Sequence, residues 1–474
     1  MSTKIESVRG RSDLPAERLA VLRGALRGRL LLPGEAGYDD ARMLWNAMID
    51  RHPAAIVRAE LAADVVAAVN FTRENGLELA VKGGGHNIAG SAVSEGGLML
   101  DLSPMKSIEV DAAARTARVA PGVTLGELDR ATQEHGLALP VGINSTTGIA
   151  GLTLGGGFGW LSRKHGLTID NLTAAEVVTA DGRSHRATAR DDGELFWALR
   201  GGGGNMGVVT SFEYRLHPVG PEVFAGLIVH PFENARALLQ GYREVVAQAP
   251  EDLTIWTVVR QAPPLPFLPV EWHGREVLVF AFCYLGGVAN GDAAIASLRA
   301  LGEPIAEHAG PMPLADWQTA FDPLLTPGAR NYWKSHDFRQ LVDGAIEGII
   351  DAVDQLPTPE CEVFIAHLGG AINRVAVDAT AYPHRDVHFV MNAHARWREA
   401  SQDASCIAWA RGLFEAAAPF ATGGVYVNFM PDDERARVQP GAYGPNFNRL
   451  ATLKAKYDPN NLFRLNQNIA PAGR

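Results

Sequence analysis

Three consecutive glycines precede a histidine in VKGGGHNIAG, residues 81–90. Glycine loses more backbone entropy on folding than any other residue, so such a run indicates close backbone approach or positive φ angles. Backbone N–H groups without Cβ atoms around them can surround a diphosphate. His86 would then be held beside the bound group, where its imidazole could meet a bulky cofactor, although a lone histidine is more often structural.

Two more glycine-rich segments follow, GIAGLTLGGGFGW at residues 148–160 and GGGNMG at residues 202–207. The second of these satisfies the pattern G-x-G-x-x-G, whose dinucleotide mechanism requires a strand before it and a helix after it. Here a predicted helix precedes the glycines and an alternating strand follows them. The inverted order excludes a Rossmann site and leaves a loop that a ligand can approach closely.

Other reactive patterns are weak. HRDVH at residues 384–388 lacks the glutamate of H-E-x-x-H, alternates like a strand and has no obvious third ligand, so we expect no metal. The chain contains no G-x-S-x-G sequence, so an esterase-type nucleophile is unsupported.

Composition limits the class of protein. A chain of 474 residues is too long for a single hydrophobic core, so we expect two or three domains. Its 43 Lys and Arg residues are outnumbered by 53 Asp and Glu residues, which argues against a nucleic-acid partner. The three cysteines form neither a disulfide framework nor a metal pattern, which favours a reducing compartment. No signal peptide and no run of about 18 apolar residues is present, so we expect a cytoplasmic protein without a membrane segment.

The elements that must position these residues change character along the chain. We expect a helix at 61–75 that ends at Gly76, a strand at 77–81 that leads into the first glycine loop, and a capping box of Thr124 and Glu127 opening another helix. From about residue 220, helical runs at 234–248, 292–301 and 341–356 alternate with long apolar strands. That pattern predicts an antiparallel sheet with helices on one face.

Taken in order, the motifs resemble the berberine-bridge-enzyme-like branch of the FAD-linked oxidases, within the vanillyl-alcohol-oxidase and p-cresol-methylhydroxylase (PCMH) superfamily. The similarity covers nearly the whole chain and is carried by VKGGGHNIAG, DLSPMKSI, APGVTLGEL, GLTLGGGFGWLSRKHGLTIDNL, ALRGGGGNMGVVTSF, NYWKS, GGVYVNF and YDPNNLFRLNQNI. It implies an α+β fold. A PCMH-type FAD-binding domain of two α/β subdomains would occupy residues 1–218 (core about 50–218), a substrate-binding domain with an antiparallel sheet flanked by helices residues 219–422, and residues 423–474 would return to the first domain.

The resemblance also implies how the cofactor is held. Family members join the histidine of the GGGH loop covalently to the 8α-methyl group of the flavin, which makes His86 the implied attachment point. Many add a second link through a cysteine where this chain has Asn144, so a single link is expected. Thr147 matches a residue that lines the oxygen pocket; its size favours an oxidase, while its hydroxyl leaves a dehydrogenase open.

The other implied cofactor contacts lie in the glycine tracts, in the strand after the third glycine segment and near the C-terminus, where the asparagines could equally cap turns. They are Lys82, Gly83, Gly84, Gly85, Asn87, Gly90, Gly142, Ser145, Thr146, Gly148, Gly151, Leu152, Gly155, Gly156, Gly157, Gly159, Trp160, Gly207, Val208, Val209, Asn428, Asn466 and Asn468.

Tyr426 in GGVYVNF matches the position beside the reactive edge of the flavin and is the candidate general base; the alternative is that it only packs in the core. A phenol with a pKa of about 10 is a poor base at neutral pH, so a nearby cation such as Lys334 would have to lower that pKa. The weaker candidates for the substrate pocket are Tyr332, Trp333, Lys334, His384 and Asn392.

The sequence therefore predicts an FAD-dependent oxidoreductase with one covalent link through His86 and no metal. A small-molecule alcohol or other activated C–H donor would give hydride to the flavin, and molecular oxygen would become hydrogen peroxide. Two alternatives remain open: a flavin dehydrogenase with another acceptor, and a non-catalytic flavin-binding protein.

Overall fold

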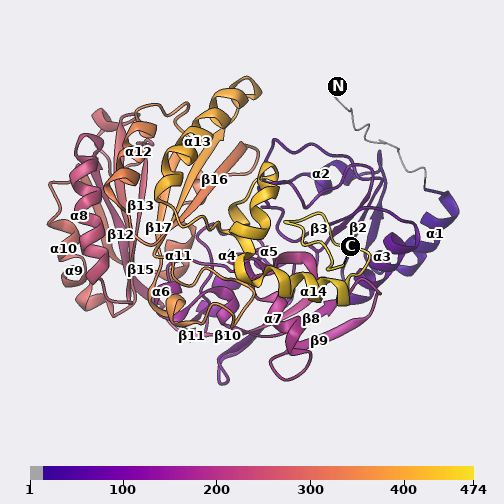
Figure 1. Ribbon diagram of the computed structural model, residues 1–474. Helices are drawn as coiled ribbons and strands as arrows, with labels where there is room; N and C mark the ends of the chain where they lie inside the picture. Colours follow the sequence, from indigo (N-terminus) through magenta and orange to yellow (C-terminus); the bar gives the residue numbers. More distant parts are fainter. Residues whose placement is uncertain (1–13, 474) are drawn as a thin grey trace.

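The computed structural model describes residues 14–473, which form sheets of four, five and seven strands and a two-stranded ribbon (Figure 1). The seven-stranded sheet and its helices occupy one side of the molecule in Figure 1, and the N-terminal elements occupy the other. Parallel strands are confined to the four-stranded sheet, and the larger sheets are antiparallel. This arrangement confirms the predicted α+β fold.

The four-stranded sheet has the order β1-β2-β4-β3. Its helix α3 (Ala62–Glu74) is followed by Gly76 at φ 63°, as the sequence pattern predicted. Strand β3 (Leu79–Lys82) then leads directly into the first glycine loop. The remaining elements of this region are α1 (Ala16–Ala25), β1 (Arg29–Leu31), α2 (Tyr38–Arg42), β2 (Ala55–Arg58) and β4 (Leu98–Asp101).

The five-stranded antiparallel sheet has the order β5-β6-β10-β8-β9. Helix α4 (Leu125–Gln133) begins at the predicted capping box, in which the backbone N–H of Thr124 donates to Glu127 Oε2 at 2.7 Å. The other elements are β5 (Ile108–Asp111), β6 (Thr116–Val119), β7 (Leu137–Ala138), α5 (Ile149–Leu154), α6 (Ser162–His165), β8 (Leu172–Val178), β9 (Ser184–Thr188), α7 (Gly193–Leu199), β10 (Val208–Arg215) and β11 (His217–Pro218).

The seven-stranded sheet is antiparallel, with the order β15-β12-β14-β13-β17-β18-β16. Helices α8, α12 and α13 bury one of its faces, while alternate strand residues such as Trp256 pack on the other side toward the N-terminal half. The elements are β12 (Glu222–Pro231), α8 (Ala235–Gln248), β13 (Leu253–Gln261), β14 (Glu276–Tyr284), α9 (Gly291–Ala294), α10 (Ala296–Arg299), β15 (Ala306–Pro313), α11 (Leu314–Thr319), β16 (Arg330–Phe338), α12 (Asp343–Val353), β17 (Glu362–His367), β18 (Phe389–Trp397) and α13 (Asp403–Ala417).

Two predicted elements differ from the structure. The helix expected at residues 292–301 is broken into α9 and α10 at Ile295, which has φ −102° and ψ 6°. Ile295 and Leu298 are fully buried in the core of the helical layer, so packing outweighs helix continuity here. Residues 384–388 are not a strand, and residues 14–473 contain no group of three or more His, Cys, Asp or Glu side chains arranged to hold a metal ion.

The C-terminal segment packs against the N-terminal half. Residues such as Val425, Leu450 and Ile469 share one hydrophobic core with the four- and five-stranded sheets. Helix α14 (Phe447–Tyr457) lies beside α7, and Lys454 in it forms a fully buried ion pair with Asp458. Figure 1 shows this segment crossing from the seven-stranded sheet back to the first elements of the chain.

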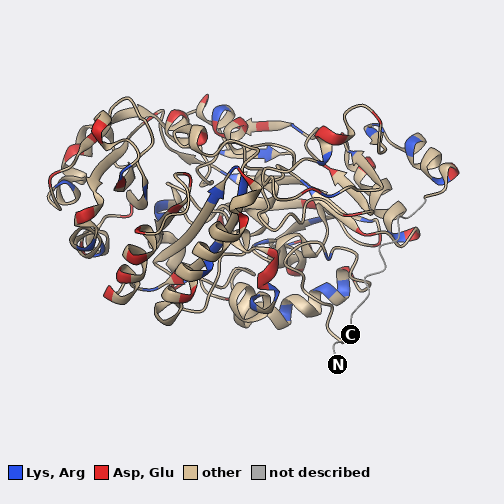
Figure 2. Ribbon diagram, turned by 90° about the horizontal axis from the view of Figure 1, so that it is seen from above, with Lys and Arg blue, Asp and Glu red and all other residues tan. Residues whose placement is uncertain are grey.

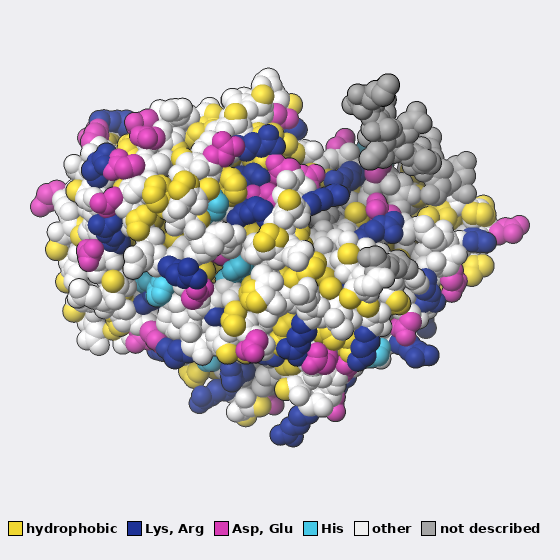
Figure 3. Space-filling view, in the orientation of Figure 1, with side chains coloured by type: hydrophobic (Ala, Val, Ile, Leu, Met, Phe, Trp, Pro, Cys, Tyr) yellow, Lys and Arg dark blue, Asp and Glu magenta, His cyan; other side chains and the backbone are white. Residues whose placement is uncertain are grey.

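Lys and Arg are interspersed with Asp and Glu over the molecule (Figures 2 and 3). None of the helices within residues 14–473 has the length and apolar character needed to cross a membrane. Cys283, Cys361 and Cys406 are all buried and free.

Candidate active site

The first two glycine tracts meet backbone to backbone. A Cβ atom on Gly84 would lie 2.3 Å from the backbone N of Gly148, and a Cβ atom on Gly148 would lie 2.3 Å from the N of Gly84. Only residues without side chains can approach in this way. The contact joins the loop after β3 to the start of α5, so both tracts form one wall.

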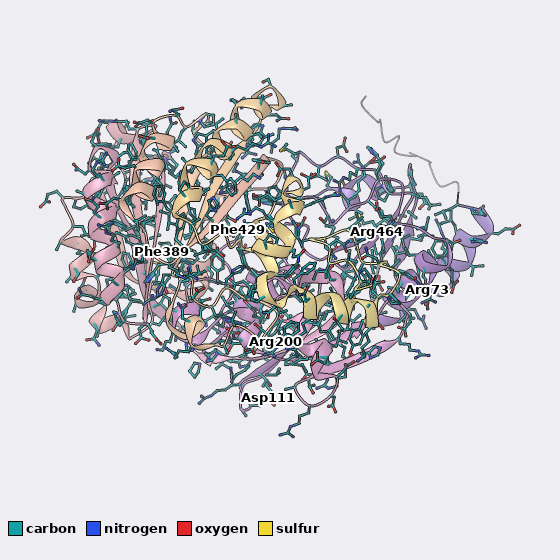
Figure 4. All side chains as sticks on the ribbon, viewed as in Figure 1. Arg73, Asp111, Arg200, Phe389, Phe429 and Arg464 are labelled. Carbon is teal, nitrogen blue, oxygen red and sulfur yellow. The ribbon has the colours of Figure 1, made fainter. Side chains whose placement is uncertain are left out.

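This wall borders a main cavity of about 270 Å³. Strands β13, β16, β17 and β18 supply the opposite wall, and residues from the C-terminal segment lie between the two. Figure 4 shows one of them, Phe429, where this segment meets the seven-stranded sheet. The sequence-predicted residues that line the main cavity are Gly83, Gly84, Gly85, His86, Asn87, Gly142, Asn144, Thr147, Gly148, Gly151, Leu152, Trp333, Asn392, Tyr426 and Asn428.

A second cavity of about 170 Å³ adjoins the main one, since Gly83, Asn87, Gly151 and Asn428 line both. Its other predicted residues are Gly207, Val208, Val209 and Asn466. Gly203 and Gly204 also line it and were missed as contacts. The sequence feature that could have identified both glycines as contacts is the G-x-G-x-x-G segment at residues 202–207 that contains them.

The later glycines of the second tract lie outside both linings and serve packing instead. A Cβ atom would lie 2.2 Å from Asn428 Oδ1 at Gly155, 2.1 Å from Thr168 Oγ1 at Gly157 and 1.8 Å from the carbonyl oxygen of Val141 at Gly159. Gly156 has φ 131°. These positions require glycine because protein atoms approach them.

Several other predicted contacts are likewise used within the protein. The structure places them outside the cavity linings: Lys82 Nζ donates to the carbonyl of Ala41, Gly90 packs on Ile49, Ser145 binds Asp322, Thr146 bonds to His86, and Trp160 is buried in stacking contact with Trp256. Asn468 also lies outside both linings, and its Oδ1 has no partner among the described residues. Trp160, predicted as a cofactor contact, belongs to the hydrophobic core instead.

Tyr426 has its phenol oxygen at the edge of the second glycine tract. Its Oη accepts hydrogen bonds from the backbone N–H of Gly157 and from Nδ2 of Asn428, both at 2.9 Å. Burial raises the pKa of Tyr426 to about 12, although both hydrogen bonds oppose the rise. The expectation that a cation lowers this pKa is therefore wrong.

Lys334 lies on the opposite face of β16 and cannot act on Tyr426. Its Nζ lies 3.0 Å from Glu434 Oε1 and 3.2 Å from Asp433 Oδ1. Tyr332 points the same way and donates to Asp433 at 2.7 Å. Because side chains alternate along a strand, only Trp333 between them reaches the cavity.

His384 is also absent from the cavity. Its Nε2 donates to the carbonyl of Ala442 at 3.1 Å, and its Nδ1 lies 3.5 Å from Asp337. The prediction that Tyr332, Lys334 and His384 line the pocket is wrong, whereas Trp333 and Asn392 do line it.

Aromatic side chains that the sequence did not single out form much of the cavity wall. They are Trp45, Phe158, Trp256, Phe364 and Phe429. Phe158 and Phe429 lie in the motifs GLTLGGGFGW and GGVYVNF, so their segments were marked although the residues were not. Trp45, Trp256 and Phe364 come from separate strands and loops that no motif marked.

One carboxylate, Glu362, also lines the main cavity and was missed. It bonds to Arg260 at 2.7 Å and to His394 at 3.0 Å. Although burial opposes it, the positive charge of Arg260 and the contact with His394 lower the pKa of Glu362 to about 2. The cavity wall therefore carries the negative charge of Glu362, which the positive charge of Arg260 balances.

His86 lines the same cavity with a neutral ring. Burial lowers the pKa of His86 to about 3. The imidazole stacks on Trp45, with ring centroids 5.0 Å apart and planes at 21°. A neutral, fixed imidazole is a competent nucleophile.

The residues around the two cavities fit FAD. Three buried polar atoms there have no partner among the described residues: Oδ1 of Asn392, Nε1 of Trp333 and Oδ1 of Asn466. Leaving such atoms unpaired is costly, so they suit a bound polar ligand. Glycine-lined backbone along both adjoining cavities can hold a long dinucleotide, with its diphosphate near the glycines.

The comparisons with known proteins agree. Residues 53–188 match the family described as FAD binding domain, and residues 425–470 match the family described as berberine and berberine like. An FAD-linked oxidoreductase of Dictyostelium discoideum is 33% identical over 94% of this chain and 95% of its own length. (R)-6-hydroxynicotine oxidase of Paenarthrobacter nicotinovorans is 29% identical over 95% of this chain and 98% of its own.

Solved structures show the same relationship. The crystal structure of 6-hydroxy-D-nicotine oxidase from Arthrobacter nicotinovorans matches with a TM-score of 0.84 at 28% identity, over 94% of this chain and 98% of the other. With the glycine-lined cavities, these matches identify an enzyme that uses FAD. The chain belongs to the berberine-bridge-enzyme-like FAD-linked oxidoreductases.

Proposed function

We propose that the protein is an FAD-dependent oxidase that takes hydride from an alcohol or another activated C–H bond of a small donor and reduces oxygen to hydrogen peroxide. The position of Tyr426 in the cavity wall, with two hydrogen-bond donors on its oxygen, carries this proposal. When bound, FAD supplies the two-electron acceptor.

In this proposal Tyr426 accepts the proton of the donor's hydroxyl group at its Oη. The N–H of Gly157 and the amide of Asn428 stabilise the phenolate form that must accept this proton. The two hydrogen bonds also fix the position of the phenol oxygen, so the hydroxyl group of the substrate meets an atom held in place in the cavity wall.

The walls of the main cavity favour an apolar, uncharged donor. Trp256, Phe364 and Phe429 provide flat apolar surface, and Glu362 is already paired with Arg260. The unpaired atoms of Asn392 and Trp333 offer one acceptor and one donor for orientation. We infer that aromatic alcohols fit better than sugars or carboxylates.

Oxygen as the electron acceptor is supported by Thr147, a small residue in the cavity wall. The name of the (R)-6-hydroxynicotine oxidase relative points in the same direction. The single covalent link is supported by His86, whose neutral ring lines the cavity, while Asn144 offers no thiol for a second link.

Anaerobic mixing with a panel of uncharged aromatic alcohols, sugars and carboxylic acids tests the proposal by bleaching of the flavin absorbance. We expect bleaching by an alcohol and rapid recovery on mixing with air. Slow recovery would identify a dehydrogenase. Acid precipitation should leave the flavin on the polypeptide, whereas a His86→Ala variant should release it; release from the unaltered protein would refute the link.

A further inference from the structure

We infer that Asn144 and Thr146 form a hydrogen-bond relay that fixes the tautomer of His86 and leaves Nδ1 as the atom that bonds to the flavin. The inference rests on the covalent link proposed above. It assigns a positioning role to both residues, because the side chain of Asn144 bonds to Thr146, and that of Thr146 bonds to Nε2 of the histidine rather than to the atom that forms the link.

The relay begins at Asn144. The backbone N–H of Thr146 donates to Oδ1 of Asn144 at 3.2 Å, which identifies the amide atom facing Thr146 as oxygen. The Oγ1 atom of Thr146 lies 2.8 Å from the same Oδ1. Two oxygens at this distance need a proton between them, and only the threonine hydroxyl has one to give.

The direction of this bond determines the next one. Thr146 Oγ1 also lies 2.9 Å from Nε2 of His86. Because the hydroxyl proton is donated to Asn144, Oγ1 accepts a hydrogen bond from the N–H group at Nε2. A neutral imidazole carries one N–H, so Nδ1 keeps its lone pair.

The free lone pair has little competition. The nearest hydroxyl to Nδ1 is that of Thr147, at 3.4 Å, which is long for a hydrogen bond. The stacked ring of Trp45 fixes the plane of the imidazole. Both His86 and Thr147 line the main cavity, so the side of the imidazole that carries Nδ1 lies next to a cavity residue.

The loop that carries the relay is held at several points. Ser145, between the two relay residues, donates its N–H to Asp322 Oδ1 at 3.0 Å, and its carbonyl accepts the N–H of Gly126 at 2.9 Å. The carbonyl of Thr147 accepts the N–H of Leu125 at 2.9 Å. A relay on a rigid loop holds one tautomer better than a mobile one does.

The covalent step balances with the proposed acceptor. A bond would form between Nδ1 and the carbon of the flavin's 8α-methyl group while one C–H bond of that methyl group breaks and releases its proton to solvent. The imidazole would lose its Nε2 proton to solvent through exposed Thr146. The two electrons released pass to the flavin ring and then, with two protons, to oxygen, giving hydrogen peroxide.

The test compares Thr146→Val, which keeps the shape but removes the hydroxyl, with Thr146→Ser, which keeps the hydroxyl. Full-length protein is purified at intervals after induction, and the acid-stable fraction of its flavin is measured beside its total flavin. We expect Thr146→Val to bind flavin but to form the covalent link about tenfold more slowly, as the loss of one hydrogen bond implies, and Thr146→Ser to behave as the unaltered protein.

NMR of the isolated flavin–peptide identifies which imidazole nitrogen of His86 is bonded to the flavin. Correlation of the methylene protons with imidazole Cγ indicates Nδ1, and correlation with Cδ2 indicates Nε2. A link through Nε2, or an unchanged rate in Thr146→Val, would overturn the relay alone. Absence of acid-stable flavin in the unaltered protein would overturn the proposed link and the relay together.

Discussion

The Oη atom of Tyr426 lies 2.9 Å from the backbone N of Gly157, and this short contact ties the C-terminal segment to the second glycine tract. Gly157 has φ 79°, and a Cβ atom there would meet Thr168 at 2.1 Å. The N–H group is therefore aimed by backbone geometry that other residues would not adopt. Tyr426 therefore accepts a hydrogen bond from an N–H group whose position is fixed.

Replacing Tyr426 by Phe should slow anaerobic flavin reduction by about 10²- to 10⁴-fold, because the proton acceptor is lost. Flavin content should not change. Stopped-flow absorbance measures both. The matched control is Tyr382→Phe: Tyr382 is buried with its ring centroid 6.4 Å from that of Tyr426, and its hydroxyl has no partner among the described residues. Equal rates in the two variants would show that Tyr426 only packs.

The reduction rate should rise with pH. Burial raises the pKa of Tyr426 to about 12, so the phenolate fraction grows roughly tenfold per pH unit below that value. The Phe variant should lose this slope. The same raised pKa stabilises the folded protein below the unfolded value of about 10, and that contribution is lost between about pH 10 and 12. A flat profile in the unaltered protein would contradict Tyr426 as the base.

The glycines of the GGGH loop could be predicted from the sequence, because the tract itself indicates close backbone approach, whereas the later glycines of the second tract proved to serve packing. The faces of the seven-stranded sheet could not be predicted. In the run Tyr332-Trp333-Lys334, Tyr332 and Lys334 lie on the face that meets helix α13, and Trp333 lies on the face toward the cavity. Both faces are covered by other parts of the protein, so the pattern of residue types does not show which face borders the cavity. The partners of Lys334 also lie about a hundred residues away in the chain.

Glu362 shows a second limit of prediction from the sequence, which concerns the order of strands in the sheet. Its partners Arg260 and His394 come from β13 and β18, which flank β17 only in the folded sheet. Strand order decides which charges meet, and local patterns do not encode that order. By contrast, helix α3 and the capping box of α4 depend on neighbouring residues, and both were predicted correctly.

Two glycine substitutions should distinguish a glycine that is needed for contact within the protein from a glycine that leaves room for the cofactor. Gly84→Ala should lower the melting temperature and abolish flavin binding, because its Cβ would collide with Gly148. Gly151→Ala should keep or raise the melting temperature of flavin-free protein, since no protein atom lies within 4 Å of its Cβ and alanine favours the helix by about 1 kcal/mol. Its flavin content should nevertheless fall, because Gly151 lines both cavities. Full flavin binding by Gly151→Ala would place the cofactor elsewhere.

Enlarging Thr147 should block oxygen. Thr147→Leu should slow reoxidation of the reduced flavin by about tenfold or more while anaerobic reduction continues, because a larger side chain fills the cavity wall. Thr147→Val, which keeps the shape, serves as the control. Equal reoxidation rates in Leu and Val variants would show that oxygen takes another route.

Asp129 should make folding depend on pH. Burial raises its pKa to about 7, above the unfolded value of about 3.9, so the folded state binds the extra proton between these values. Stability should therefore fall as pH rises from about 4 to 7, by on the order of 4 kcal/mol at most.

Asp129→Asn should remove that slope and be the more stable protein at pH 8. Gln318 donates to Asp129 at 3.1 Å and has a carbonyl oxygen without a partner among the described residues, so an amide finds both a donor and an acceptor there. Urea unfolding at pH 5 and pH 8 measures the difference. Exposed Glu74→Gln is the control, and a similar slope in Asp129→Asn would assign the effect to other groups.

The C-terminal segment gives the site an order of assembly. Tyr426, Asn428 and Asn466 close walls that the N-terminal tracts leave open, so neither cavity exists while the ribosome is still adding residues 425–467. Enclosure of a dinucleotide in these cavities therefore requires that residues up to Gln467 have been synthesised and have packed against the N-terminal half.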